Sequence, residues 1–162
     1  MDTNVITPEG YAELQQELDT LWRHERPEVT RKVQWAASLG DRSENADYQY
    51  NKKRLREIDR RVRFLRNRLS KLRVVEYNPV QEGKAYFGAW VTLVDEDDQT
   101  LTFRIVGPDE IYGKQHYVSV HAPVVKACLG KAEGDEVRVR TPDSVKLWEI
   151  AEIRYGLAAA DR

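Results

Sequence analysis

The feature that most constrains the fold is a regular row of apolar residues in the first half of the chain. Apolar residues recur in steps of three and four at Leu55, Ile58, Val62, Leu65, Leu69 and Leu72. This spacing matches the a and d positions of a heptad repeat and predicts a helix that packs along a narrow seam. A partner precedes it, with apolar residues at Tyr11, Leu14, Leu18, Trp22, Val29, Val33 and Ala36. Few residues separate the two patterns, so we expect an antiparallel two-helix coiled coil.

The first helix carries start and stop signals at single residues. Thr7 is a good N-cap, Pro8 suits the first helical position, and Gly40 is placed to end the helix. Pro27 lies inside the pattern and is expected to bend or locally break the helix, because proline lacks a backbone N–H. The turn between the two helices is therefore expected to begin near Gly40.

After residue 77 the periodicity changes from helical to strand-like. Segments such as YFGAWVTLV, TLTFRIVG, DEVRVRT and KLWEIAEIRYG alternate or are rich in β-branched and aromatic residues, with Gly, Pro and Asp between them. One short helix is expected at about residues 122–129, ending at Gly130. The chain is thus predicted to be α+β. We expect a coiled-coil domain at residues 1–77, a small domain with a twisted antiparallel sheet at residues 78–157, and a frayed tail at 158–162.

Composition excludes several classes of protein. The single cysteine, Cys128, excludes an intramolecular disulfide and a cysteine-rich zinc site, and we expect it to pack on the short helix. No apolar run is long enough to span a bilayer, and no apolar signal segment follows Met1, which predicts a cytoplasmic protein without a membrane partner. With 26 basic and 27 acidic side chains, overall charge says little about partners, whereas its distribution says more.

Acidic residues gather in the expected turn, LGDRSENADYQY, and allow two interpretations. In the first, Asp41 and Glu44 form a capping box at the start of the second helix, and Ser43 is another possible cap. In the second, the Asp41 and Glu44 carboxylates point outward to a metal ion. Two carboxylates are a plausible partial shell for Mg²⁺, which takes further ligands from phosphates or water. Such an incomplete site suggests that another molecule supplies the remaining ligands. The two interpretations are compatible.

The second helix is strongly basic. Residues 42–73 contain twelve Lys and Arg residues against four acids. With Leu55 at position a, the outward b and f positions hold Lys53, Arg56, Arg60 and Arg63, and Lys52 lies beside them at e. Some g and e cations can pair with Glu13, Glu17, Glu25 or Glu28 of the first helix. The outward stripe has few acids on its face, so it predicts contact with a nucleic-acid backbone. Tyr50 could stack on a base, whereas Tyr48 is expected to pack at the end of the coil.

The segment WAASLGDRSENADYQYNKKRLREIDRRVRFL closely resembles the bacterial Gre transcript cleavage factors, and within that family the GreB group. ITPEGYAEL, LWRHERPEVTRKV, FGAW, FRIVGPDEIYG and GKAEGDEVRV extend the resemblance over nearly the whole chain. It implies an FKBP-like second domain that docks at the secondary channel of RNA polymerase. It also implies that the coiled coil enters this channel, where Asp41 and Glu44 help the polymerase hold a shared Mg²⁺. The factor is then no enzyme itself, and binds no cofactor alone.

The resemblance assigns further roles. Ser43 and Asn45 support the acidic pair, and the basic residues, Lys52 among them, contact the 3′ end of backtracked RNA. Ser119, His121 and Pro123 in SVHAPVV match the polymerase-docking loop, although the family often has Asp where His121 stands. We expect a monomer. Three other interpretations stay open: an inhibitor that occupies the same channel, a coiled-coil chaperone with an isomerase-like domain, and a standalone nuclease. Retention of Asp41 and Glu44 argues against the inhibitor.

Overall fold

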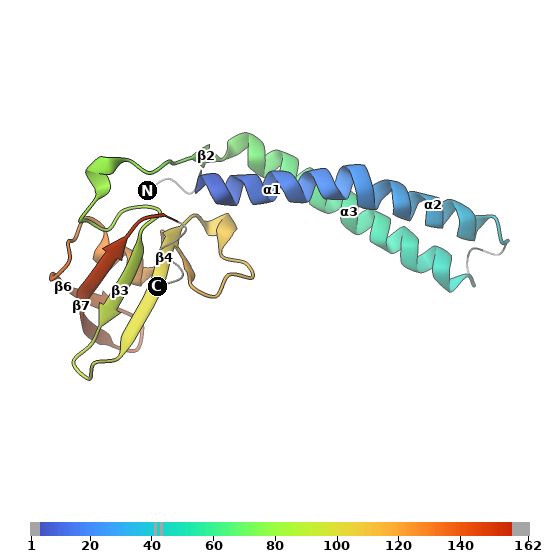
Figure 1. Ribbon diagram of the computed structural model, residues 1–162. Coiled ribbons are helices and arrows are strands. Elements are labelled where there is room, and N and C mark those ends of the chain that lie inside the picture. The colour runs from blue at the N-terminus through green and yellow to red at the C-terminus, as the bar shows by residue number, and fades with distance from the viewer. Residues whose placement is uncertain (1–3, 41, 43, 157–162) are drawn as a thin grey trace. The chain divides into compact units, whose positions relative to one another are not determined.

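The helical part of the computed structural model is a pair of antiparallel helices (Figure 1). The structure describes residues 4–40, 42 and 44–156. By contacts the chain divides into two compact units, which are described separately: unit 1 contains Met1–Gly10 and Arg73–Arg162, and unit 2 contains Tyr11–Leu72. Among the described residues, no helix has both the length and the apolar character needed to cross a membrane.

Unit 2 contains the predicted hairpin. Its outgoing arm consists of α1 (Pro8–Thr20) from Tyr11 onward, a π-helical segment (Leu21–Glu25) and α2 (Arg26–Ala37), and its returning arm is α3 (Ala46–Lys71). The start at Pro8 confirms the N-terminal signal, and the Oγ1 atom of Thr7 accepts a hydrogen bond from the Gly10 N–H at 3.1 Å.

The seam of the hairpin is the predicted one on α3. Ile58 and Leu65 are fully buried and Val62 nearly so, and they pack with Leu21, Val29 and the partly buried Leu14, Leu18, Val33 and Leu55. Trp22 was wrongly placed in this seam, because its side chain is 43% exposed while the neighbouring Leu21 is buried. The π-helical segment explains the shift, since it inserts an extra residue per turn just before Pro27 and changes which side chains face α3.

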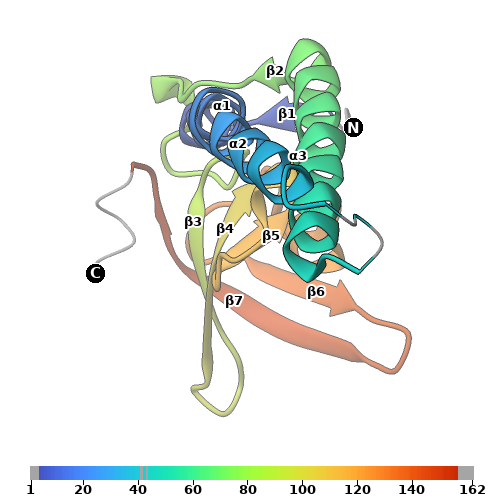
Figure 2. The same cartoon turned by 90° about the vertical axis from the view of Figure 1, so that its right-hand side faces the viewer.

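Unit 1 is built on a curled sheet. Its five described strands lie in the order β5-β4-β3-β7-β6, and the long strand β7 shows the twist in Figure 2. Their bounds are β3 Trp90–Val94, β4 Thr100–Val106, β5 Tyr117–Ser119, β6 Glu136–Arg140 and β7 Val145–Arg154. The sheet is antiparallel as predicted, except that β5 runs parallel to β4. This exception is possible because a long connection, including a 3₁₀ turn at Pro108–Glu110, joins the two strands.

A short helix, α4 (Pro123–Cys128), closes the core of unit 1. Cys128 is fully buried among Val91, Phe103 and Ile150, which confirms its packing role, and burial raises the pKa of its thiol to about 11. Gly130 follows the helix with a φ of 78°, a left-handed conformation that glycine adopts without strain.

The first ten residues belong to unit 1 because they bind residues far along the chain. Strand β1 (Val5–Ile6) pairs in parallel with β2 (Arg73–Val74). Residues 73–77, which we expected in the coiled-coil domain, therefore lie in unit 1. The expected tail at residues 158–162 lies outside the described residues.

A buried carboxylate holds this N-terminal segment. Glu110 accepts hydrogen bonds from the Thr7 N–H at 3.0 Å, from the Gly107 N–H at 2.8 Å and from the Thr7 hydroxyl. Burial raises the pKa of Glu110, although these hydrogen bonds act in the opposite direction. Beside it the Arg104 guanidinium, also buried, donates to the Glu9 carboxylate at 3.0 Å.

Candidate functional site

The acidic tip is only partly described. Asp41 and Ser43 lie outside the described residues, so the expectations placed on them stay predictions. Glu44 directly precedes the last residue before α3, and its side chain is exposed. Arg42 is exposed as well. The Glu44 carboxylate is therefore accessible from solvent in the free protein.

Asn45 is the residue that caps α3. Its Oδ1 atom accepts a hydrogen bond from the Tyr48 N–H at 3.1 Å, while its Nδ2 atom donates to the Ala36 carbonyl at 2.7 Å. One side chain thus satisfies a free N–H at the start of α3 and adds a second hydrogen bond to a carbonyl at the end of α2, which also accepts from the Leu39 N–H. The capping box that we considered for Asp41 and Glu44 is wrong, because the helix begins at Ala46 and Asn45 fills the N-cap position.

Tyr48 lies buried behind the tip, as expected for a residue at the end of the coil, with 7% of its surface exposed. Its hydroxyl accepts a hydrogen bond from the Lys52 ammonium at 2.9 Å, and this contact lowers the pKa of the phenol. Arg42 lies over the same ring, with its guanidinium carbon 5.7 Å from the ring centroid. Tyr50, by contrast, is 71% exposed and free to stack on a base.

The cations of α3 fall into two groups. Arg61 binds Glu17 with two hydrogen bonds of 2.6 and 2.9 Å, and Arg54 binds Glu25 at 3.3 Å, as the g positions predicted. Lys53, Arg56, Arg60 and Arg63 are exposed, and none of these four makes an ion pair within the described part of the chain. Lys52 is exposed too, but its ammonium binds Tyr48.

The four unpaired cations form a continuous stripe. They are spaced by three, four and three residues, so they lie on one face of α3. We call Lys53, Arg56, Arg60 and Arg63 the basic stripe. Its arrangement suits an extended polyanion, because successive positive charges follow the helix axis and none of them is paired with an acid in the described part of the chain.

The heptad argument missed a stacked cluster on the coil. Two guanidinium groups contact the exposed Trp22 ring, with the Arg66 Cζ atom 4.5 Å and the Arg26 Cζ atom 5.2 Å from its centroid. Arg26 also donates to Asp59 of α3 at 2.7 Å. The sequence indicated Trp22 only as a seam residue. The π-helical segment changes which side chains face α3, and Trp22 is therefore exposed beside the two arginines.

The expected docking loop connects β5 to α4. Ser119 ends β5 and its Oγ atom accepts a hydrogen bond from the His121 N–H at 3.2 Å. Pro123 is the first residue of α4 and is exposed. His121 is half-buried rather than on the open surface, and within the described residues its buried Nε2 atom has no hydrogen-bond partner.

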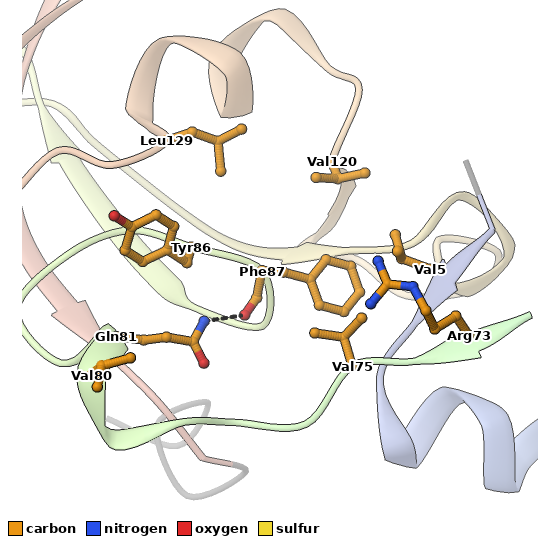
Figure 3. Close-up of a pocket in the computed structure, with 9 residues that line it drawn as sticks. All are labelled: Val5, Arg73, Val75, Val80, Gln81, Tyr86, Phe87, Val120 and Leu129. Atoms are coloured by element: carbon orange, nitrogen blue, oxygen red, sulfur yellow. Dashed lines mark hydrogen bonds between the residues drawn. The ribbon is translucent and has the colours of Figure 1, made fainter. Parts of the chain in front are cut away.

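Next to this loop, unit 1 has an apolar pocket of about 430 Å³ (Figure 3). Gln81 spans its edge and donates to the Phe87 carbonyl at 3.3 Å. The pocket is lined by Val5, Arg73, Val75, Val80, Gln81, Tyr86, Phe87, Val120 and Leu129. Val120 joins the pocket directly to the docking loop.

The described residues contain no cluster of three or more His, Cys, Asp and Glu side chains able to hold a metal ion.

Comparison with known proteins defines the class of this two-unit molecule. A family model described as "Transcription elongation factor, N-terminal" matches residues 4–74. A second model, described as "Transcription elongation factor, GreA/GreB, C-term", matches residues 80–155. Between them these models span both the helical hairpin and the sheet domain.

Curated relatives agree with this class. A protein named transcription elongation factor GreB from Pseudomonas putida is 61% identical over 156 residues, which cover 96% of each chain. A protein of the same name from Vibrio vulnificus is 56% identical, over 96% of this chain and 98% of its own. A solved structure of the transcription factor Gfh1 is 25% identical over 93% of this chain and 96% of that one, with a TM-score of 0.43. The chain belongs to the GreA/GreB family of transcription elongation factors.

Proposed function

We propose that this protein enters the secondary channel of bacterial RNA polymerase and stimulates the polymerase's own cleavage of backtracked RNA. Family membership supports the role in elongation, and the relatives of 56–61% identity carry the GreB name. The single observation that carries the proposal is the layout of the hairpin. It places an exposed carboxylate, Glu44, at the turn and an unpaired basic stripe along the arm that follows.

The acidic tip acts as a set of ligands for a Mg²⁺ ion shared with the polymerase. A carboxylate oxygen is the type of ligand that Mg²⁺ prefers, and the exposed Glu44 side chain is available to provide one. Asp41 provides the second, and the polymerase and the RNA supply the rest. When bound, the ion favours the attacking water and the leaving oxygen in a two-metal hydrolysis. Asn45 keeps the two helix ends together, and Ser43 supports the same turn.

The basic stripe holds the RNA that is cut. Its four charges, with Lys52, attract the phosphates of the extruded 3′ segment without reading its bases. The loop with Ser119, His121 and Pro123 docks on the rim of the channel. The protein itself cuts nothing, since it completes a site that belongs to its partner.

The test uses a backtracked elongation complex with labelled RNA. We expect this protein to shorten the RNA from its 3′ end in a Mg²⁺-dependent reaction. Asp41→Asn and Glu44→Gln should abolish stimulation while binding to polymerase stays nearly intact. Asp47→Asn is a matched control, because Asp47 is an exposed acid in the first turn of α3 and has no assigned role. If the Asp41 and Glu44 variants stimulate like the parent, the acids have no catalytic part.

The same assay separates the alternatives. Slower cleavage with the parent protein would indicate a channel-occupying inhibitor, and RNA cutting without polymerase would indicate a nuclease. The apolar pocket of unit 1 makes an isomerase-like activity testable too, and acceleration of proline isomerisation in a peptide would favour it.

The RNA contact has a separate test. Replacing Arg56, Arg60 and Arg63 with Ala should weaken crosslinking to the RNA 3′ end. It should also make the binding constant for RNA less sensitive to salt. Each lost phosphate contact reduces the slope of log K against log salt concentration by about 0.7, so the loss of three contacts reduces it by about 2. Replacing Lys131, Arg138 and Arg140 with Ala removes the same charge from unit 1 and serves as the control. Equal effects of the two triple variants would contradict a role for the stripe.

A further inference from the structure

Arg42 is held in place by two separate contacts with α3, and the proposed function assigns it no role. Its guanidinium lies over the Tyr48 ring, 5.7 Å from the centroid. Its backbone carbonyl accepts a hydrogen bond from the Gln49 Nε2 atom at 2.8 Å. An exposed arginine normally samples many rotamers; the ring contact favours those over Tyr48, and the hydrogen bond fixes the backbone that carries the side chain.

The Tyr48 ring brings two cations together. The Lys52 ammonium donates to the phenol oxygen at 2.9 Å and lies 5.2 Å from the ring centroid, while Arg42 occupies the same ring. Two like charges beside one ring repel, and the negative face of the aromatic ring offsets part of that repulsion. Neither cation has a carboxylate partner within the residues that the structure describes.

We propose that Arg42 binds a phosphodiester group of the RNA at the tip, together with Lys52, and that Tyr48 and Gln49 are positioning residues for Arg42. This inference rests on the proposed function. The guanidinium supplies the planar fork that matches two phosphate oxygens, and the ammonium supplies a point charge beside it. The site takes a phosphate adjacent to the bond that is cut, because Arg42 is two residues from Glu44 in the turn.

The turn carries charges of opposite sign at Arg42 and Glu44. Glu44 is exposed to solvent two residues from Arg42, so a carboxylate and a guanidinium both belong to this short turn. When Glu44 serves as a metal ligand, its charge is taken up, and Arg42 becomes effective toward phosphate. Within the described residues Arg42 makes its side-chain contact with the Tyr48 ring and no ion pair with Glu44, and the ring contact leaves the guanidinium N–H groups available to a phosphate.

The test measures single-turnover cleavage of backtracked RNA over a range of factor and Mg²⁺ concentrations. We expect Arg42→Ala to lower the maximal rate by roughly tenfold or more, the effect of losing one charge-assisted contact. The half-saturating concentrations of factor and of Mg²⁺ should stay unchanged. Arg42→Lys should recover only part of the rate, because lysine keeps the charge but not the fork.

Gln49→Leu distinguishes positioning from direct contact. It should lower the rate by about threefold in the parent and not at all in the Arg42→Ala background, because Gln49 acts through Arg42. Both side chains are exposed, so thermal unfolding of the variants should match the parent. Tyr48→Phe keeps the ring under Arg42 and should retain most of the rate.

Three results would overturn the inference. An unchanged maximal rate for Arg42→Ala would contradict the contact, and a higher half-saturating factor concentration with that unchanged rate would place Arg42 against the polymerase wall instead. A higher Mg²⁺ requirement would show that Arg42 only shapes the acidic turn. If the parent protein itself does not stimulate cleavage, the proposed function fails first, and that outcome is recognised without any variant.

Discussion

Alanine at Gly10 should destabilise unit 1, although the same change normally stabilises a helix. Gly10 lies in the first turn of α1, where replacing glycine by alanine is usually worth about 1 kcal/mol. Here the nearest atoms to an added Cβ all belong to Glu110, with Cδ at 2.6 Å and Cγ at 2.8 Å. Real Cβ atoms do not approach other atoms so closely, so the Glu110 side chain has to move.

The cost of that movement follows from the contacts of Glu110. Its carboxylate accepts hydrogen bonds from the Thr7 N–H, the Thr7 hydroxyl and the Gly107 N–H in a buried site. A hydrogen bond to a charged group contributes about 1.5–3 kcal/mol, so the loss of two costs about 3–6 kcal/mol. After the gain in helix propensity, Gly10→Ala should lower the free energy of unfolding of unit 1 by about 2–5 kcal/mol.

The assay is a urea titration followed by the amide NMR signals of β3 and β4, which report unit 1. Glu110→Ala provides the decisive background, because it removes the three atoms nearest to the new Cβ. In that background Gly10→Ala should become neutral or stabilising by about 1 kcal/mol. A stabilising effect in the parent, or an equal loss in both backgrounds, would refute the reasoning.

Three further outcomes follow from burial. Ile58→Ala should cost about 2–5 kcal/mol in helix unfolding followed by circular dichroism, because Ile58 is fully buried in the seam, whereas Arg56→Ala on the surface should not. Cys128 should react with a thiol-specific reagent at pH 8 only as fast as unit 1 opens, since burial raises its pKa to about 11. Burial also raises the pKa of Glu110, so the protonated carboxyl adds stability to the folded state below its ordinary pKa of 4.5, and this added stability is lost as the pH rises through the folded pKa. Urea titrations between pH 4 and 7 should show this loss in the parent and not in Glu110→Gln.

Local and periodic signals in the sequence were sufficient for much of the fold. The seam on α3 was predictable because a repeat of three and four residues has only one helical solution. The start at Pro8 was predictable because Thr7 and Pro8 act on their own turn. The g-position pairs of Arg54 and Arg61 followed from the heptad positions alone.

The remaining features depend on residues far apart in the chain. The caps that we considered were Asp41 and Ser43, whereas the residue that caps α3 is Asn45, which also binds the Ala36 carbonyl across the hairpin. Glu110 lies 103 residues from Thr7, so no local pattern could indicate their contact. The parallel pairing of β5 likewise depends on the path of a long connection.

The basic stripe should reduce the stability of the hairpin. Lys53, Arg56, Arg60 and Arg63 are helical neighbours at three- and four-residue spacing, and each like-charge pair costs about 0.2–0.5 kcal/mol. Three such pairs cost about 1 kcal/mol in total, and no ion pair within the described residues offsets this cost. If these cations only stabilised the coil, we would expect each of them to pair with an acid, as Arg61 does when it binds Glu17 with two hydrogen bonds.

This contrast predicts that the two kinds of arginine on α3 affect the melting temperature in opposite directions. Replacing Arg56, Arg60 and Arg63 with Ala should leave the melting temperature of the hairpin unchanged or raise it at low salt, and the gain should vanish at high salt as the repulsion is screened. Arg61→Ala should lower it slightly, because it removes an ion pair across the seam. Circular dichroism at two salt concentrations measures both effects. A loss of stability in the triple variant would mean that the stripe supports the fold, and its exposed charges would then be no evidence for RNA binding.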